Sequence, residues 1–348
     1  MLNNKHDDVV QLIDDVLQLA VEKRASDIHI EPTTSGCRTR FRVDGLLECT
    51  NNIPNGFKDR LITRLKILSN LNIAETRLPQ DGHLHFTHEK RSINCRISTC
   101  PTIHGEKIVL RILYDKPTQI NIENLGLLDS QLSIVKKNLS KPQGLILVTG
   151  PTGSGKTISL YSFLKHINTN TKNIVTIEDP VEIIINNINQ LGINLKAGLT
   201  FAKALRAFLR QDPDIIMLGE IRDSETAQIA IRAALTGHLV LSTLHANHAI
   251  DAITRLTSLG ISPINVSSSL QLVIAQRLIR KIHKKTFQGR TGIFECLHIN
   301  EKSRFQITNS ETISNNNLTT LRQAAKVKIG QGITTQEETE RVLNYDNE

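Results

Sequence analysis

One segment restricts the fold of this 348-residue chain more than any other feature. Gly150-Pro-Thr-Gly-Ser-Gly-Lys-Thr157 follows a short apolar run, residues 145–149, and precedes a stretch with helical spacing, residues 158–166. A glycine-rich loop between a strand and a helix lets backbone N–H groups surround phosphate oxygens, because a side chain at Gly153 or Gly155 would block the approach. The segment therefore predicts a phosphate-binding loop in a domain of alternating strands and helices.

The side chains of this loop have separate expected roles. Lys156 is expected to reach the β- and γ-phosphates of a nucleotide, and the Thr157 hydroxyl is expected to hold Mg²⁺. The predicted nucleotide-binding set comprises Gly150, Pro151, Thr152, Gly153, Ser154, Gly155, Lys156 and Thr157.

The pattern around the loop predicts an α/β fold. Short apolar runs of the kind found in buried parallel strands occupy residues 145–149, 173–177, 214–218 and 239–243. Helices are expected between them: one follows Asp223, with Ser224 as its cap and Gly237 as its end, and another begins at Ser262-Pro263. This alternation is typical of a mostly parallel sheet covered by helices.

The N-terminal region has a different pattern, of short alternating strands with two helical stretches. Strands are expected at residues 26–31, 39–45, 92–99 and 106–113, with Asp44-Gly45 as a hairpin turn. Residues 57–73 predict an amphipathic helix whose outer face is basic, through Lys58, Arg60, Arg64 and Lys66. We expect an α+β domain over residues 1–114, a linker over 115–122 and an ATPase-type domain over 123–348, ending in a helical subdomain from roughly residue 248.

Carboxylates follow two of the expected strands. Ile177-Glu-Asp-Pro-Val-Glu182 places three acids beyond a strand end, where open α/β sheets bind ligands, and either Glu178 or Glu182 could polarise a water or hold Mg²⁺ through water. A solvated acidic turn is the plainer alternative. The apolar run at residues 214–218 resembles the acidic strand that follows the phosphate-binding loop in ATPases with such a loop. Gly219 stands where that strand usually ends in an Asp, so Glu220 is the candidate acid at the metal and water.

Histidines and arginines supply the other candidates. His238 precedes and His245 follows the strand expected at 239–243, so the two cannot ligate one metal, and either could be a structural histidine. Arg96 lies on the polar side of its strand, whereas Arg111 interrupts an apolar run and needs a partner or an anion. Either arginine could neutralise transition-state charge in a neighbouring subunit.

Composition excludes several classes of protein. The net charge of +8 fits an anionic partner or simply a basic solvated surface. No apolar run approaches the roughly 18 residues of a membrane span, and the first residues lack the order of a signal peptide. The five Cys show no C-x-x-C spacing, so neither a disulfide framework nor a tetrathiolate zinc site is expected.

The motifs together resemble the secretion ATPase superfamily that powers type II secretion and type IV pilus or competence pseudopilus assembly. The resemblance extends from about residue 8 to residue 340, and its motifs occur in the family's order. They are Arg24-Ala-Ser-Asp-Ile-His-Ile-Glu-Pro32, Phe41-Arg-Val-Asp-Gly45, Arg77-Leu-Pro-Gln-Asp-Gly82, His104-Gly-Glu106, the phosphate-binding loop, Glu178-Asp-Pro-Val-Glu182, Leu209-Arg-Gln-Asp-Pro-Asp214, Gly219-Glu-Ile-Arg-Asp223, the two-histidine strand, Ala275-Gln-Arg-Leu278 and Gly289-Arg-Thr-Gly-Ile-Phe-Glu295.

The resemblance implies a fold, an oligomeric state, cofactors, a partner and a set of site residues. It implies a RecA-like P-loop ATPase domain preceded by a smaller PAS-like domain, a homo-hexameric ring that uses ATP and Mg²⁺, and an inner-membrane platform protein as partner. The expected location is cytoplasmic, on the inner face of the cytoplasmic membrane. Its implied site residues are Glu182 as catalytic base, Glu220 as the second acid, His238 and His245 as the histidine box, and Arg96 and Arg111 at the γ-phosphate.

Two departures from the family pattern accompany the resemblance. The extra N-terminal domain of the long members is not expected, because the first matching motif is already at Arg24. The two C-x-x-C pairs that many members carry after an Ala-Gln-Arg-Leu helix are replaced here by the short segment 280–289, so no zinc is predicted and His283 is expected at the surface.

Three rival functions remain open at this stage. Retraction of a pilus, rather than assembly, is the nearest, although residues 289–295 and 219–223 resemble assembly motors. A DNA translocase or conjugation-type motor on the same core has the basic helix from Lys58 to Lys66 as its support, and nucleic acid is not the expected partner. The third is a nucleotide-binding regulator that hydrolyses poorly, and the presence of Lys156, Glu182 and Glu220 speaks against it.

Overall fold

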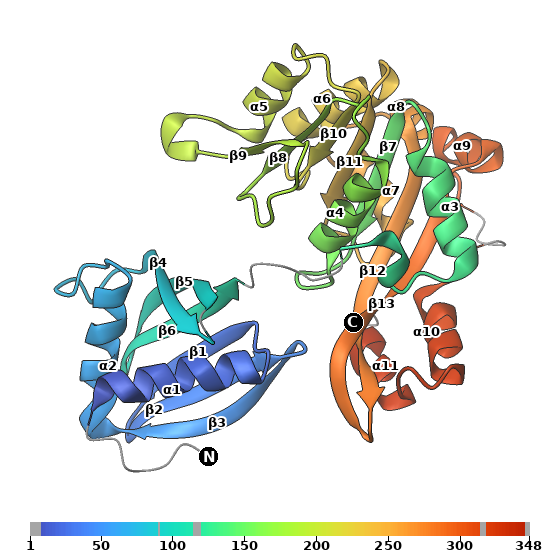
Figure 1. Ribbon diagram of the computed structural model, residues 1–348. Helices are drawn as coiled ribbons and strands as arrows, with labels where there is room; N and C mark the ends of the chain where they lie inside the picture. The colour runs from blue at the N-terminus through green and yellow to red at the C-terminus, as the bar shows by residue number, and fades with distance from the viewer. Residues whose placement is uncertain (1–7, 90, 114–119, 314–317, 345–348) are drawn as a thin grey trace. The chain divides into compact units, whose positions relative to one another are not determined.

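The computed structural model describes residues 8–89, 91–113, 120–313 and 318–344, and the chain divides into two compact units, residues 1–117 and 118–348 (Figure 1). Residues 115–119 of the expected linker lie outside the described residues. Ile120 and Ile122, which were also expected in the linker, are buried in the core of the second unit. Each unit has its own hydrophobic core and is described by itself.

The first unit is a six-stranded antiparallel sheet packed against helices α1 and α2 (Figure 1). The sheet order is β3-β2-β1-β6-β5-β4. Asp44 and Gly45 form the two-residue turn between β2 and β3 with positive φ angles of 47° and 90°, which suits an Asp-Gly hairpin turn. The elements are α1 (Val9–Glu22), β1 (Asp27–Thr33), β2 (Gly36–Val43), β3 (Leu46–Pro54), α2 (Asn55–Leu68), β4 (Gln80–His88), β5 (Arg91–Thr102) and β6 (Gly105–Leu113).

Helix α2 differs from its sequence-based prediction at two points. It ends at Leu68, because Asn70 adopts a left-handed conformation that closes the last turn. Lys66 does not lie on the basic outer face: it is 1% exposed and belongs to the buried residues of the helix with Leu61 and Leu65. Its ammonium donates to both carboxylate oxygens of Glu106 at 2.9 Å and to the Glu75 carbonyl at 2.7 Å, so the buried charge is fully paired.

The second unit is built on a seven-stranded sheet of order β13-β12-β7-β11-β10-β8-β9. All neighbours pair in parallel except β12 and β13, which form a long antiparallel hairpin. The strands are β7 (Gly144–Thr149), β8 (Ile174–Glu178), β9 (Asn189–Gly192), β10 (Ile215–Leu218), β11 (Leu239–Leu244), β12 (Leu270–His283) and β13 (Thr286–His298).

Helices cover both faces of this sheet (Figure 1). In β7, Leu145 and Leu147 pack into one apolar cluster and Ile146 and Val148 into another, because successive side chains of a strand point to opposite faces. The predicted α/β fold with a mostly parallel sheet is confirmed. The helices are α3 (Asp129–Leu139), α4 (Lys156–Ile167), α5 (Phe201–Phe208), α6 (Ser224–Leu235), α7 (Asp251–Ser258), α8 (Pro263–Ser269), α9 (Glu301–Thr308), α10 (Leu321–Gly330) and α11 (Gln336–Leu343).

Three local predictions in this unit are corrected. The cap of α6 is Asp223, whose carboxylate accepts from the Thr226 amide at 2.7 Å, and not Ser224. The region from residue 248 is not purely helical, because it contains β12 and β13. Ala275-Gln-Arg-Leu278 consequently lies in a strand: an apolar run alone does not distinguish helix from strand, and here pairing with β7 and β13 decides.

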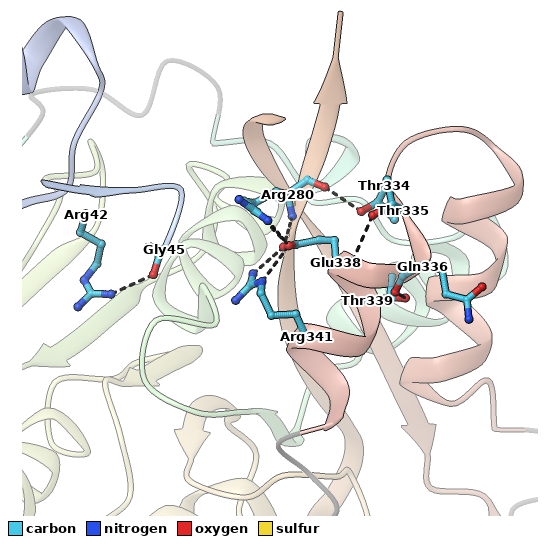
Figure 2. Close-up of polar contacts among 9 residues, drawn as sticks. All are labelled: Arg42, Gly45, Arg280, Thr334, Thr335, Gln336, Glu338, Thr339 and Arg341. Atoms are coloured by element: carbon cyan, nitrogen blue, oxygen red, sulfur yellow. Dashed lines mark hydrogen bonds and ion pairs between the residues drawn. The ribbon is translucent and has the colours of Figure 1, made fainter. Parts of the chain in front are cut away.

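A buried carboxylate joins the C-terminal helices to the β12–β13 hairpin (Figure 2). Glu338 of α11 has a fully buried side chain and accepts hydrogen bonds from Arg341 and from the backbone and guanidinium of Arg280, at 2.6–3.0 Å. Burial by itself would raise the pKa of Glu338, but these hydrogen bonds lower it from 4.5 to about 2. Figure 2 also shows a contact of the first unit, in which Arg42 donates to the Gly45 carbonyl of the β2–β3 turn.

This pairing makes stability depend on pH. Because the folded-state pKa of Glu338 is depressed, its contribution is complete above about pH 5 and is lost as the pH falls toward 2. We expect Glu338→Gln to destabilise the second unit by about 1–3 kcal/mol at pH 7, and the difference from the parent protein to shrink below pH 5. Calorimetric unfolding of the full chain at several pH values measures this. Glu340→Gln, at an exposed position of the same helix, is the control and should leave the unfolding temperature unchanged.

Candidate nucleotide-binding site

The phosphate-binding loop connects β7 to α4, as predicted. Its glycines are required by backbone conformation and by close neighbours: Gly155 has φ +89°, and a Cβ there would lie 2.9 Å from the Gln276 side chain. A Cβ on Gly150 would lie 2.5 Å from the Gln276 carbonyl. Strand β12, which extends beyond the end of β7, therefore supports the loop from one side.

Two polar side chains of the loop are suited to an anion. The Lys156 ammonium lies against the loop carbonyls, 2.8 Å from Gly150 and 3.0 Å from Pro151. Burial lowers the pKa of Lys156, and the nearby Glu220 carboxylate opposes that effect. Within the part of the chain that the structure describes, the buried Ser154 hydroxyl has no hydrogen-bond partner. A buried hydroxyl without a partner is costly, which favours a ligand oxygen at this place.

Glu220 is fixed beside the loop by both neighbouring strands. The Gly219 amide donates to the Ile177 carbonyl of β8 at 2.8 Å, and the Ile221 amide donates to the Thr243 carbonyl of β11 at 3.0 Å. A Cβ at position 219 would come within 3.3 Å of the Ile177 carbonyl. Because β8 approaches so closely, a side chain at position 219 would be crowded. This accounts for glycine at the position where the sequence pattern led us to look for an Asp.

The electrostatic surroundings keep Glu220 ionised. Burial would raise its pKa, but the hydrogen bond from Arg222 at 2.5 Å and the charges of Arg222, His245 and Lys156 lower it overall. His245 Nε2 lies 3.6 Å from the carboxylate. Thr157, Glu220 and the loop therefore offer the hydroxyl and carboxylate oxygens that Mg²⁺ prefers, beside a lysine for phosphate.

The two glutamates at the end of β8 and in the loop after it have different surroundings. Glu178 is buried and accepts hydrogen bonds from Tyr161, from Thr176 at 2.6 Å and from Gln190 at 3.1 Å. Glu182 is exposed, on the loop that follows β8. The sequence left open which of the two activates water. Because its oxygens are occupied inside the protein, Glu178 is a structural acid, and Glu182 is the better candidate.

The two histidines of the β11 segment are at opposite ends of the strand, as predicted. His245 follows β11 at the level of Thr149, beside Glu220. His238 precedes β11 at the opposite edge of the sheet, and its ring contacts the Ala233 carbonyl at 3.1 Å at the end of α6. The structure brings His245 to the loop but not His238, so His238 is left out of the site proposed below.

The candidate arginines belong to the first unit and lie directly opposite each other on β5 and β6. Arg111 donates to Asp27 at 2.9 Å, which supplies the partner that its position required, and Arg42 lies 3.8 Å from the same carboxylate. The Arg111 side chain is nevertheless 66% exposed. Two positive side chains at directly opposing positions of a sheet repel each other. The pair Arg96 and Arg111 therefore favours the binding of an anion.

Comparison with known proteins identifies the family. The chain matches the family described as "Type II/IV secretion system protein" over residues 3–341. It belongs to this family.

Curated relatives support the same assignment. The "Protein transport protein HofB homolog" of Haemophilus influenzae is 48% identical and aligns with 96% of this chain and 73% of its own length. The "Type IV pilus assembly ATPase PilB" of Acinetobacter baylyi is 42% identical, over 97% of this chain and 66% of the relative. "Type II secretion system protein E" of Pseudomonas aeruginosa is 40% identical, over 97% of this chain and 76% of the relative.

Two solved structures have a similar fold. The ATPase DotB of Legionella pneumophila matches with a TM-score of 0.79 over 98% of this chain and 97% of that one, at 23% identity. The pilus retraction motor PilT with bound ADP matches with a TM-score of 0.66 over 97% of both chains, at 30% identity. The second unit is thus a RecA-like P-loop ATPase domain.

Some residues at the site were not singled out from the sequence. Arg222 is within the quoted Gly219-Glu-Ile-Arg-Asp223 motif, and Gln276 and Arg277 are within Ala275-Gln-Arg-Leu278. Gln276 lies against the loop glycines, and the charge of Arg277 adds to the effect of burial in lowering the pKa of Lys156. These contacts depend on the tertiary fold, because β12 meets the loop only through its pairing with β7. In the sequence, only their membership of the quoted motifs pointed to these residues.

The described ranges contain neither a metal-binding cluster nor a membrane-spanning helix. No group of three or more His, Cys, Asp or Glu side chains is arranged to hold a metal ion. None of the helices there combines the length and apolar character that crossing a bilayer requires. His283, at the end of β12, is exposed.

The lysine of the loop provides a direct test of the site. We expect Lys156→Ala to weaken ATP binding by at least about tenfold, because charge-assisted hydrogen bonds to phosphate contribute about 1.5–3 kcal/mol each. Titration calorimetry with a non-hydrolysable ATP analogue measures the change. Lys165→Ala, at an exposed position of the same helix, is the control, and equal affinities of the two variants would contradict the site.

Proposed function

We propose that this protein is an ATP-hydrolysing motor that assembles as a homo-hexameric ring and drives assembly of a type IV pilus or a type II secretion pseudopilus. The observation that carries the proposal is the phosphate-binding loop, with the buried Ser154 hydroxyl and Lys156, beside the ionised Glu220. The family assignment supports a secretion-system role, and relatives named as pilus assembly and type II secretion proteins support assembly.

The residues divide the work of hydrolysis among them. Lys156 and the loop amides bind the phosphates, and Glu182 accepts a proton from the attacking water. When Mg²⁺ is bound, it neutralises phosphate charge, and Thr157, with Glu220 through water, would hold it. His245, 3.6 Å from Glu220, is placed to respond to the γ-phosphate.

The arginines of the first unit complete the proposed ring. Arg96 and Arg111, opposite each other on one sheet face, supply positive charge to the γ-phosphate of a neighbouring subunit. Domain rotation biased by the presence of the γ-phosphate would then act on a platform protein of the inner membrane. In this proposal the motor works in the cytoplasm, on the inner face of that membrane.

Pilus retraction is the second candidate. The likeness to the retraction motor PilT, with a TM-score of 0.66 at 30% identity, favours it. The relative named as a pilus assembly ATPase is 42% identical, and we therefore prefer assembly. A DNA translocase receives less support than its sequence pattern suggested, because Lys66 of the basic helix is buried against Glu106.

Glu220 tests the hydrolysis chemistry. We expect Glu220→Gln to bind ATP with unchanged affinity but to hydrolyse it at least about a hundredfold more slowly, since the acid acts at the metal and the water and the amide cannot. Phosphate release and ATP retention on the purified protein measure the two effects. Glu225→Gln, an exposed acid of α6, is the matched control. Hydrolysis at the parental rate would remove Glu220 from the site.

Mixed rings test whether a subunit completes its neighbour's site. We expect Arg96→Ala and Lys156→Ala each to lack ATPase activity alone, and their co-expressed mixture to regain part of it. Some sites would then combine Lys156 from one variant with Arg96 from the other. A mixture of Lys156→Ala with Glu220→Gln, whose changes are in the same unit, should stay inactive. Normal turnover by Arg96→Ala alone, or no recovery in the mixture, would contradict the ring arrangement.

A further inference from the structure

A buried tyrosine links the helix of the phosphate-binding loop to the segment that carries Glu182. Tyr161 lies five residues beyond Lys156 in α4 and is fully buried. Its hydroxyl donates to the Glu178 carboxylate and accepts from the backbone amides of Glu182, at 3.2 Å, and Ile183, at 3.4 Å. One side chain on a rigid helix therefore contacts both the end of β8 and the backbone of Glu182.

Gln190, which shares the partner Glu178 with Tyr161, contacts the same segment from β9. Gln190 of β9 donates to the Glu178 carboxylate at 3.1 Å and to the Ile183 carbonyl at 2.9 Å, and accepts from the Ile185 amide at 2.7 Å. Residues 179–188 contain no helix or strand. The backbone of this segment is consequently held by side-chain contacts rather than by secondary structure. Tyr161 and Gln190 contact its first half, whereas Asn168 donates to the Asn186 carbonyl at 2.9 Å and Ile183, Ile185 and Ile188 pack against the core.

The Tyr161 hydroxyl keeps its proton under all physiological conditions. Burial raises the pKa of Tyr161, and the hydrogen bond to Glu178 and its charge raise it further. The direction of the bonds is therefore constant: the hydroxyl donates to Glu178 and its oxygen remains an acceptor for the two amides. Loss of the hydroxyl would leave two loop amides and a buried carboxylate without this partner.

We propose that Tyr161 is a positioning residue that holds Glu182 at the distance from the phosphate-binding loop that hydrolysis requires. The inference rests on the proposed role of Glu182. Glu182 is exposed and belongs to an irregular segment, so only its backbone is fixed, and Tyr161 fixes it relative to the helix that begins at Lys156. A displacement of about 1 Å in a catalytic group can cost up to about a hundredfold in rate, so a hydrogen bond at this place affects turnover rather than binding.

The experiment compares Tyr161→Phe with the parent chain. We expect the kcat for ATP hydrolysis to fall about tenfold while the affinity for ATP stays within about twofold, because the aromatic ring and the loop contacts of Lys156 are retained. Ser162→Ala is the matched control: it removes a buried hydroxyl from the next residue of α4, whose hydrogen bond to the Ile158 carbonyl stays inside the helix. It should hydrolyse ATP at the parental rate.

A second comparison separates positioning from general damage. In a Glu182→Gln background, measured by single-turnover hydrolysis, Tyr161→Phe should cause no further loss, because the group that it positions is already missing. An additional tenfold loss in the double variant would overturn the proposal. If Tyr161→Phe does not fold, Gln190→Met replaces it in the comparison, because Gln190 also contacts the segment that carries Glu182. We then expect Gln190→Met to lower turnover in the parent chain but to cause no further loss in the Glu182→Gln background.

The outcomes distinguish this inference from the function on which it rests. Parental turnover by Glu182→Gln would refute the catalytic role of Glu182 and with it the positioning role of Tyr161. Loss of turnover in Glu182→Gln together with parental turnover in Tyr161→Phe would refute the positioning role alone. A fall in ATP affinity equal to the fall in kcat for Tyr161→Phe would place its effect on the binding loop and would also overturn the inference.

Discussion

The parallel alignment of β7, β8, β10 and β11 is the constraint on which the second unit depends. Because the strands run in the same direction, their carboxyl ends meet at one edge, and each end passes directly into a segment with functional side chains. Both faces of the sheet are apolar and covered by helices, so the edge is the part left for polar chemistry. The phosphate-binding loop, Glu220 and His245 are close together for this reason, although nearly one hundred residues separate the first from the last.

Carboxylates of one small region differ in chemistry because their surroundings differ. Glu178 has its oxygens occupied by donors in the interior and acts as an anchor. Glu220 is partly buried among cations, which keep it ionised beside the loop lysine. Glu182 is exposed, with only its backbone held. Three glutamates thus have three different roles: Glu178 is structural, Glu220 is the candidate acid at the metal, and Glu182 is the candidate base. Their burial and their hydrogen-bond partners account for the difference.

A paired buried charge joins a helix to a sheet at two places in the chain. Lys66 joins α2 to β6 through Glu106, and Glu338 joins α11 to β12 through Arg280. In each case an interior charge is compensated by a partner from a distant part of the chain. Such pairs specify which surfaces meet, and they explain why basic residues counted as surface in a helical pattern can belong to the core.

The sequence by itself determined the elements whose signals are local. The loop at residues 150–157, the strands near β7, β8, β10 and β11, the Asp44-Gly45 turn and the α/β class follow from spacing and turn chemistry, because these depend on neighbouring residues. The tertiary structure decided the burial of Lys66, the strand conformation of residues 275–278, and the burial of Glu178 where Glu182 is exposed. Each of these depends on a partner in another element, namely Glu106 for Lys66, β7 for residues 275–278 and Tyr161 for Glu178, and no local pattern contains that partner.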